Sequence, residues 1–308
     1  MDAVVCTLFE GSYHYGLGVL TNSLARNGYK GVIWVGYRGN LPSWMNGLSK
    51  ENNYQKYKVS DDLEMNLVLL QTDAHLTNYK PDFILDIFNH YDKNATRIFY
   101  FDPDIVIKTK WENFEKWSKY GVFLSEDVNS PLNKFHPLRY AWIEYFGKYD
   151  LRLEAKEDIY VNGGFIGISK SDIEFLLLWQ KIQVYMAMEL KGLKEWGIKD
   201  RTFLFHMTDQ DALNCTIMAY KGNKTIMGKD AMDIIPGGYF MSHALGGRKP
   251  WRNKYIKNAL SGISPLKTDR LFWKYAKEGP INVYSRLYIK RKNIELLIGI
   301  FLSRFIKR

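Results

Sequence analysis

The chain is poor in cysteine. Its 308 residues include only Cys6 and Cys215, and no Cys-x-x-Cys pair occurs. This scarcity excludes a zinc ribbon with cysteine ligands and argues against a small secreted domain built on disulfide bonds. Stability must therefore come from a hydrophobic core, which a chain of this length can build.

Long apolar runs are also missing. No run of 18 or more apolar residues occurs, so no membrane-spanning helix is expected. The first residues lack a basic segment followed by a long apolar stretch, so no signal peptide is expected either. Together these absences predict a cytoplasmic location.

Basic residues are plentiful but unevenly distributed. The net charge is +10, and residues 286–308 alone hold seven basic residues and one acidic residue. The tail is therefore strongly basic, while the rest of the chain is close to an ordinary globular protein. An excess of this kind favours anionic partners, which include nucleic acid, phosphorylated ligands and acidic lipid.

Short apolar runs alternate with helical stretches. The pattern predicts a loop with three glycines at 11–18 and irregular structure at 38–60. Apolar strands separated by helices indicate an α/β fold with a mainly parallel sheet. The predicted strands are 3–9, 31–37, 97–107, 121–124 and 160–169, and the predicted helices are 81–91, 173–190 and 208–220.

The strongest strand signal ends in two carboxylates. Residues 98–101 lead directly into Asp102-Pro103-Asp104, and open α/β sheets bind ligands at the carboxyl ends of their strands. Residues two apart in an extended segment point to the same side, and Pro103 favours an extended Asp102. Two neighbouring carboxylates repel each other as free anions. A divalent cation such as Mn²⁺ or Mg²⁺ would remove that conflict.

Two other interpretations of this pair stay open. Aspartate and proline are common turn residues, so the segment can simply end a strand. Phosphatases of the haloacid dehalogenase type use an aspartyl nucleophile, which would be Asp102 here. Those enzymes normally carry the pair on their first strand, whereas here it lies a third of the way along the chain.

Four further segments accompany the pair. They are Arg97 before the strand, VNGGFIGIS at 161–169, TDQDALN at 208–214 and HALGGRKPW at 243–251. Together with the Asp-x-Asp, the patches resemble glycosyltransferase family 8 and its relatives, which are retaining enzymes with a GT-A fold. The resemblance implies a Rossmann-like, mainly parallel mixed sheet flanked by helices in a catalytic domain, 1–260. A basic helical extension, 261–308, would follow it.

The resemblance also implies a metal site and a nucleotide-sugar site. Asp102, Asp104 and His243 would hold the metal, and the imidazole favours Mn²⁺ over Mg²⁺. Asp209 and Gln210 would be the catalytic residues at the donor sugar. The other implied contacts to the nucleotide sugar are Thr7, Leu8, Tyr13, Arg97, Pro103, Asn162, Gly163, Gly164, Gly246 and Lys249.

The implied activity is transfer of a hexose from a UDP-sugar to a saccharide acceptor with retained configuration. Gln210 is a poor nucleophile, which favours front-face attack, with the leaving phosphate accepting the acceptor's proton. The expected acceptor is a lipid-linked glycan such as a lipopolysaccharide or capsule precursor. Two alternatives stay open. One is a phosphatase or phosphotransferase that uses Asp102, and the other is a non-catalytic protein that binds an anionic membrane or nucleic acid.

The tail combines apolar and basic residues. Apolar residues between Ile294 and Phe305 recur at helical spacing, with basic residues on both sides. This pattern predicts an interfacial helix on an anionic membrane surface, at the inner face of the plasma membrane. A helix packed on the domain is the alternative. No recognised nucleic-acid motif accompanies the charge, so no nucleic-acid partner is expected.

Overall fold

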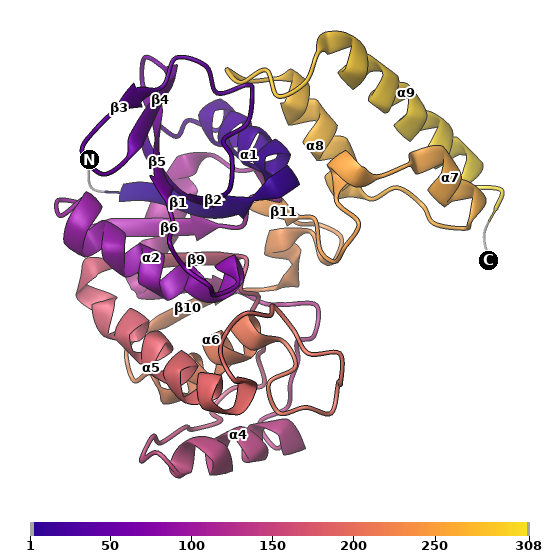
Figure 1. Ribbon diagram of the computed structural model, residues 1–308. Helices are drawn as coiled ribbons and strands as arrows, with labels where there is room; N and C mark the ends of the chain where they lie inside the picture. The colour runs from indigo at the N-terminus through magenta and orange to yellow at the C-terminus, as the bar shows by residue number, and fades with distance from the viewer. Residues whose placement is uncertain (1–2, 307–308) are drawn as a thin grey trace.

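A mixed β-sheet forms the centre of the protein. The computed structural model describes residues 3–306, and its nine-stranded sheet has the order β10-β8-β9-β6-β1-β2-β5-β4-β3 (Figure 1). β1 pairs in parallel with β2 and β6, β2 with β5, and β8 with β10. The predicted α/β class with a mostly parallel central sheet is therefore confirmed. The strands of this sheet are β1 (Ala3–Glu10), β2 (Gly31–Arg38), β3 (Ser49–Lys50), β4 (Gln55–Ser60), β5 (Leu63–Leu69), β6 (Arg97–Phe101), β8 (Val122–Ser125), β9 (Phe165–Ser169) and β10 (Lys224–Met227).

Helices cover both faces of the sheet (Figure 1). Alternate residues of β1 enter two separate hydrophobic clusters: Val5 and Phe9 pack on the side of α1 and α8, while Cys6 and Leu8 pack on the side of α2 and α5. Burial on both faces explains why the central strands read as continuous apolar runs. The helices are α1 (His14–Arg26), α2 (Lys80–Asp86), α3 (Trp111–Trp117), α4 (Pro137–Gly147), α5 (Ile173–Leu190), α6 (Thr208–Ala219), α7 (Tyr255–Leu260), α8 (Lys267–Lys277) and α9 (Arg286–Leu302).

The strand predicted at 97–107 is interrupted. β6 ends at Phe101, and β7 (Ile105–Ile107) leaves the main sheet to pair antiparallel with β11 (Met241–His243). Between them, the amide of Ile105 donates a 3.0 Å hydrogen bond to the carbonyl of Asp102. This closes a turn with Pro103 at its second position, where proline is favoured. The extended geometry predicted for Asp102 to Asp104 is therefore wrong.

Two other local predictions are corrected. Residues 38–60 contain β3 and β4, which form an antiparallel edge with polar, partly exposed side chains and so lack an apolar signal. The glycine loop predicted at 11–18 is instead a 3₁₀ turn, Gly11–Tyr13, followed by α1. Glycine inside α1 serves close packing, because a Cβ on Gly16 would collide with the carbonyl oxygen of Pro103.

Most of the predicted helices are confirmed. α5 has the predicted bounds, α6 ends one residue early, and α2 continues into a π-helical turn, Ile87–Tyr91. No helix within residues 3–306 is long and apolar enough to cross a membrane.

The C-terminal helices share the hydrophobic core of the sheet. Phe272 and Trp273 of α8 belong to the same buried cluster as Val5 of β1. The Asn22 side chain on α1 donates to the carbonyls of Tyr275 and Ile281 at 2.9 and 3.0 Å. α7, α8 and α9 lie together beside the sheet, with α9 outermost (Figure 1). The division at residue 260 stays a prediction.

Candidate metal and donor site

Two carboxylates project from the turn that follows β6. The turn is fixed on both sides, since the Asp102 amide donates to the carbonyl of Gly164 at 2.7 Å and the Ala244 amide donates to that of Asp104 at 3.2 Å. Asp104 is buried, and Asp102 is partly buried. The turn thus presents both side chains at the carboxyl edge of the parallel strands, where α/β sheets bind ligands.

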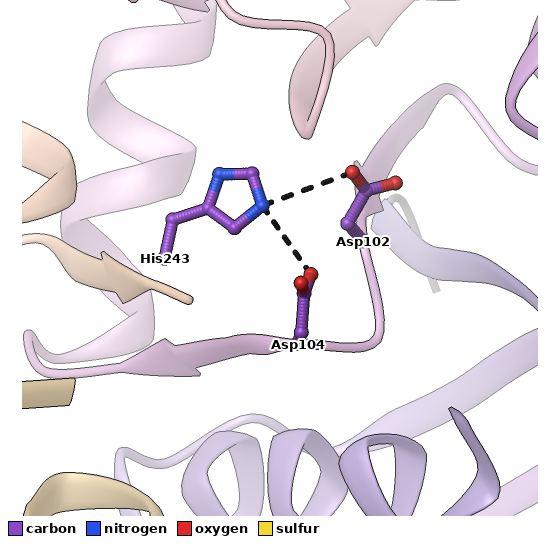
Figure 2. Close-up of side chains that lie close together, drawn as sticks. All are labelled: Asp102, Asp104 and His243. Carbon is purple, nitrogen blue, oxygen red and sulfur yellow. Dashed lines mark ion pairs between the residues drawn. The ribbon is translucent and has the colours of Figure 1, made fainter. Parts of the chain in front are cut away.

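His243 completes a group of three ligand-type side chains. β11 pairs with β7 so that His243 lies opposite Ile105, the residue after Asp104. Its Nε2 is 3.3 Å from Asp104 Oδ1 and 3.9 Å from Asp102 Oδ2, and Figure 2 shows one ring nitrogen facing both carboxylates. One ligand atom from each residue lies within 4.8 Å of the others. The structure therefore brings together the three predicted metal ligands.

Each carboxylate keeps its second oxygen for a protein partner. The Tyr100 hydroxyl donates a 2.7 Å hydrogen bond to Asp102 Oδ1, and Lys249 forms a short ion pair with Asp104 Oδ2. The oxygens that face His243 are the other two, Asp102 Oδ2 and Asp104 Oδ1. Partners of this kind orient ligands around a metal ion. Two carboxylates and one imidazole could together hold a divalent metal ion.

Gly164 leaves the space that this group needs. A Cβ at this position would lie 2.5 Å from His243 Cε1 and 3.1 Å from Asp102 Oδ2. The first distance is shorter than any ordinary carbon contact, so a side chain would push the imidazole away from the carboxylates. Glycine is therefore required here by close approach.

Lys249 supplies positive charge at the same place. Its ammonium group also donates to the carbonyl of Ala244. Burial by itself raises the pKa of Asp104, but Lys249 and His243 outweigh it and hold that pKa well below its usual range. Burial likewise lowers the pKa of Lys249, and Asp104 more than offsets this. Both groups are therefore charged at neutral pH.

Lys80 is a site residue that sequence reasoning missed. It is fully buried at the start of α2, and its Nζ lies 2.7 Å from the carbonyl oxygen of Gly163, 3.0 Å from Asp209 Oδ2 and 3.4 Å from Asp102 Oδ1. Burial lowers the pKa of Lys80, but the two aspartates raise it above its usual value. A lysine in the first turn of a helix opposes the helix dipole. A lysine at this unfavourable position was the one feature of the sequence that could have pointed to a special role for Lys80.

Asn162 is held in place by a second missed residue. Its Nδ2 donates a 2.6 Å hydrogen bond to Asp127 Oδ2, and its Oδ1 accepts one of 2.8 Å from the Gly164 amide. Asp127 is itself buried and also accepts from the side chain and the amide of Asn129. Sequence reasoning had no reason to single out Asp127, because its partner lies 35 residues away.

The first turn of α6 carries the Asp-Gln-Asp segment. Asp211 accepts a 2.8 Å hydrogen bond from the amide of Met207, the residue that precedes the helix, and one of 2.6 Å from the Tyr160 hydroxyl. Burial raises the pKa of Asp211 to about 7. Asp211 is thus a structural residue, whereas Asp209 and Gln210 face the same cleft as the metal group.

A cleft of about 480 Å³ opens over these groups. Its size suits a ligand of several rings. The predicted residues that line it are Leu8, Tyr13, Asp102, Pro103, Asp104, Asn162, Gly164, Asp209, Gln210, His243, Gly246 and Lys249.

Three predicted contacts lie elsewhere. Arg97 stands at the opposite end of β6, where its guanidinium donates to the carbonyl of Glu115 and the hydroxyl of Ser118. Thr7 is fully buried within β1. Gly163 does not line the cleft, and its carbonyl accepts a hydrogen bond from Lys80. For Arg97 the reason is length, because a five-residue strand separates its two ends by more than a side chain can reach.

Comparison with known proteins gives no family assignment. No protein-family model matches this chain, and a search of curated proteins found no match. Function is therefore inferred from the geometry and chemistry of the site.

Proposed function

We propose that the protein is a metal-dependent glycosyltransferase of the GT-A type that uses a nucleotide-sugar donor. The observation that carries the proposal is the convergence of Asp102, Asp104 and His243 in one cleft, beside the ammonium groups of Lys80 and Lys249. This combination of a hard cation site and nearby positive charge suits a phosphate-bearing ligand. The likeness of the motifs to glycosyltransferase family 8 supports the same choice.

The three ligands would hold Mn²⁺ or Mg²⁺, with Mn²⁺ preferred because of the imidazole. When bound, the metal would neutralise the diphosphate of the donor and stabilise the leaving nucleotide. Lys249 adds positive charge at that point. Gly246 and Gly247 line the cleft, and a Cβ on either would meet no atom within 4 Å, which leaves room for phosphate oxygens.

The remaining cleft residues fit the other parts of a UDP-sugar. Leu8 and Tyr13 lie at the end of β1 and in the turn after it, where the base would bind. Asp209, Gln210 and Asn162 lie farther along the chain but on the same cleft, where the hexose would bind. Asp209 would accept a hydrogen bond from a sugar hydroxyl, and Lys80 would keep it fixed.

The proposed reaction breaks the bond between the anomeric carbon and the diphosphate oxygen and forms one to an acceptor oxygen. The acceptor's hydroxyl proton passes to the departing phosphate oxygen. Gln210 carries an amide, which is a poor nucleophile, so front-face attack with retention is preferred to a covalent intermediate. Anomeric analysis of the product by NMR tests this, and a β-linkage from an α-linked donor would refute it.

The tail suggests where the acceptor is found. α9 packs inward through Ile289, Leu296 and Gly299. Its outward stripe combines apolar residues with exposed basic ones, and Leu297 and Phe301 are 65% and 58% exposed. One face is thus packed on the domain, as the alternative prediction had it, and the other fits an anionic bilayer at the cytoplasmic side. A lipid-linked saccharide is the corresponding acceptor.

One assay tests the function directly. Full-length protein with Mn²⁺ and a panel of UDP-hexoses is followed by thermal shift and by UDP release. We expect a melting temperature about 5 °C higher at a hundred-fold excess of ligand over Kd, and slow release of UDP.

The matched variants are Asp102→Asn, which should lose both effects, and Asp61→Asn, an exposed aspartate outside the cleft that should keep them. No shift with any donor would contradict the proposal. A trapped phosphoenzyme that requires Asp102 would instead establish the phosphatase alternative.

A further inference from the structure

Some residues that line the cleft have no role in the proposed donor site. They include Thr77, Val128, Met207 and Trp196. Trp196 belongs to the long loop between α5 and α6 (Figure 1). Its side chain is 55% exposed although it lines a hollow. An exposed indole inside a concave site indicates a surface that a ligand covers.

The backbone on both sides of Trp196 is fixed. The carbonyl of Glu195 accepts hydrogen bonds from Asn78 Nδ2 at 2.9 Å and from Thr208 Oγ1 at 2.8 Å. The amide of Ile198 donates to the carbonyl of His206 at 2.8 Å. Asn78 and Thr208 are both buried, and their side chains also bond to each other at 3.1 Å. These bonds hold the backbone on both sides of Trp196 in place, so a ligand that covers the indole has less of the chain to order.

The charge around the indole selects the kind of ligand. Among the described residues that line the cleft, Lys249 is the only lysine or arginine, and it pairs with Asp104 at the metal group. Thr77, Val128 and Met207 on the cleft wall carry no charge, and Glu10, Asp127 and Asp209 on the same wall are acidic. A phosphate or carboxylate would gain no partner here. An uncharged pyranose ring would place its C–H face on the indole and its hydroxyls toward polar neighbours.

We propose that Trp196 is the stacking platform for the terminal, uncharged sugar ring of the acceptor. This inference rests on the proposed glycosyltransferase function, because Gln210, on which the donor sugar would lie, lines the same cleft. The indole holds the acceptor ring and takes no part in bond making. Trp196 is thus a specificity residue that sets how well an acceptor binds, and donor binding does not depend on it.

The test separates acceptor binding from donor turnover. UDP release by full-length protein with Mn²⁺ and a UDP-hexose is measured without saccharide and with increasing methyl glycosides of glucose, galactose and mannose. In Trp196→Ala the half-saturating concentration of the stimulating glycoside should rise about ten-fold. UDP release without saccharide should stay at the wild-type rate. The half-saturating concentration for Trp196→Phe should lie between those of the wild type and Trp196→Ala.

Tyr120→Ala is the matched control, because Tyr120 is 70% exposed and lies outside the cleft. An unchanged half-saturating concentration in Trp196→Ala overturns the platform, as does an equal loss of UDP release with and without saccharide. If the wild type releases no UDP from any donor, the proposed function is refuted, and the role of Trp196 is tested separately.

That separate test is saturation-transfer NMR with the same glycosides. A signal that is lost in Trp196→Ala supports the platform, and an unchanged signal, or none in the wild type, overturns it.

Discussion

The ammonium nitrogen of Lys80 lies 3.0 Å from a carboxylate oxygen of Asp209; Lys80 is fully buried, and Asp209 is largely buried at the wall of the cleft. The pair joins the start of α2 to the start of α6, across 129 residues of sequence. Lys80 also reaches Asp102 at 3.4 Å, so it links the metal group to the proposed sugar-binding carboxylate. Removing one member would leave a buried charge without its partner.

Replacement of Lys80 tests this link. Lys80→Met should lower the free energy of unfolding by about 3–5 kcal/mol, because Asp209 would then be buried without a counter-charge. Urea unfolding measures the loss, and the double variant Lys80→Met with Asp209→Asn should recover part of it. Lys58→Met is the control, since Lys58 forms an exposed pair with Asp61. A wild-type midpoint for Lys80→Met would show that the buried pair is not needed.

The Tyr100 hydroxyl provides a finer test of the metal site. Tyr100→Phe removes the hydrogen bond to Asp102 Oδ1 and keeps the buried ring. Loss of a group that hydrogen-bonds to a metal-binding side chain typically lowers metal affinity by about 10–100-fold, so Mn²⁺ should bind to Tyr100→Phe more weakly by that factor. Calorimetric titration of Mn²⁺ measures the change. Tyr120→Phe should bind as the wild type does, and equal affinity in both variants would argue against an Mn²⁺ ion at Asp102.

Gly164 predicts a steric effect on the same site. Gly164→Ala would place a methyl group against the His243 imidazole, so we expect loss of Mn²⁺ binding. Gly247→Ala is matched in chemistry, but its methyl group would meet nothing within 4 Å, so Mn²⁺ binding should persist. Both variants are compared by Mn²⁺ titration, after circular dichroism has shown that each is folded. Full binding in Gly164→Ala would mean that His243 is not a ligand.

Asp211 predicts a dependence of stability on pH. Its pKa in the folded protein is raised from 3.8 to about 7 by burial. The folded state therefore binds this proton more tightly than the unfolded state does. The stabilisation is complete below about pH 4 and is lost as pH rises through about 7, at about 1.4 kcal/mol per pH unit.

Urea unfolding of wild type and Asp211→Asn between pH 4.5 and 8 measures this contribution. The stability of the wild type relative to the variant should fall steadily across that range up to about pH 7 and then level off. Subtracting the two curves removes the titration of every other group. A difference that stays constant with pH would show that Asp211 titrates near its ordinary value.

The outward face of α9 predicts membrane binding. Leu297→Ser with Phe301→Ser removes two exposed apolar side chains and none of the buried contacts of the helix. Binding to vesicles that contain phosphatidylglycerol should weaken by about ten-fold or more. Leu177→Ser with Val184→Ser, on the similarly exposed face of α5, is the control. Unchanged co-sedimentation of the α9 variant would refute the membrane proposal.

Sequence reasoning identified the three candidate metal ligands but missed two residues that hold the site in place. Asp102 and Asp104 were identifiable because carboxylates after a buried strand are a local pattern, and His243 was identified through the resemblance of HALGGRKPW to a family motif. The reason given for the convergence of the two carboxylates was wrong, because a turn brings them together and not an extended strand. Lys80 and Asp127 were missed since their partners are set by contacts across 129 and 35 residues.

By itself, the sequence determined the central strands β1 and β2, the helix α5 and the residue types able to bind a cation, because apolar periodicity and side-chain chemistry are local properties. Only the tertiary structure decided which of those residues meet. Strand pairing placed His243 opposite Ile105. Arg97 begins β6 and therefore lies at the end of the strand opposite to the carboxylates. Packing of α9 on one face left its other face exposed. Which distant segments pair and pack against one another is not encoded in any local pattern.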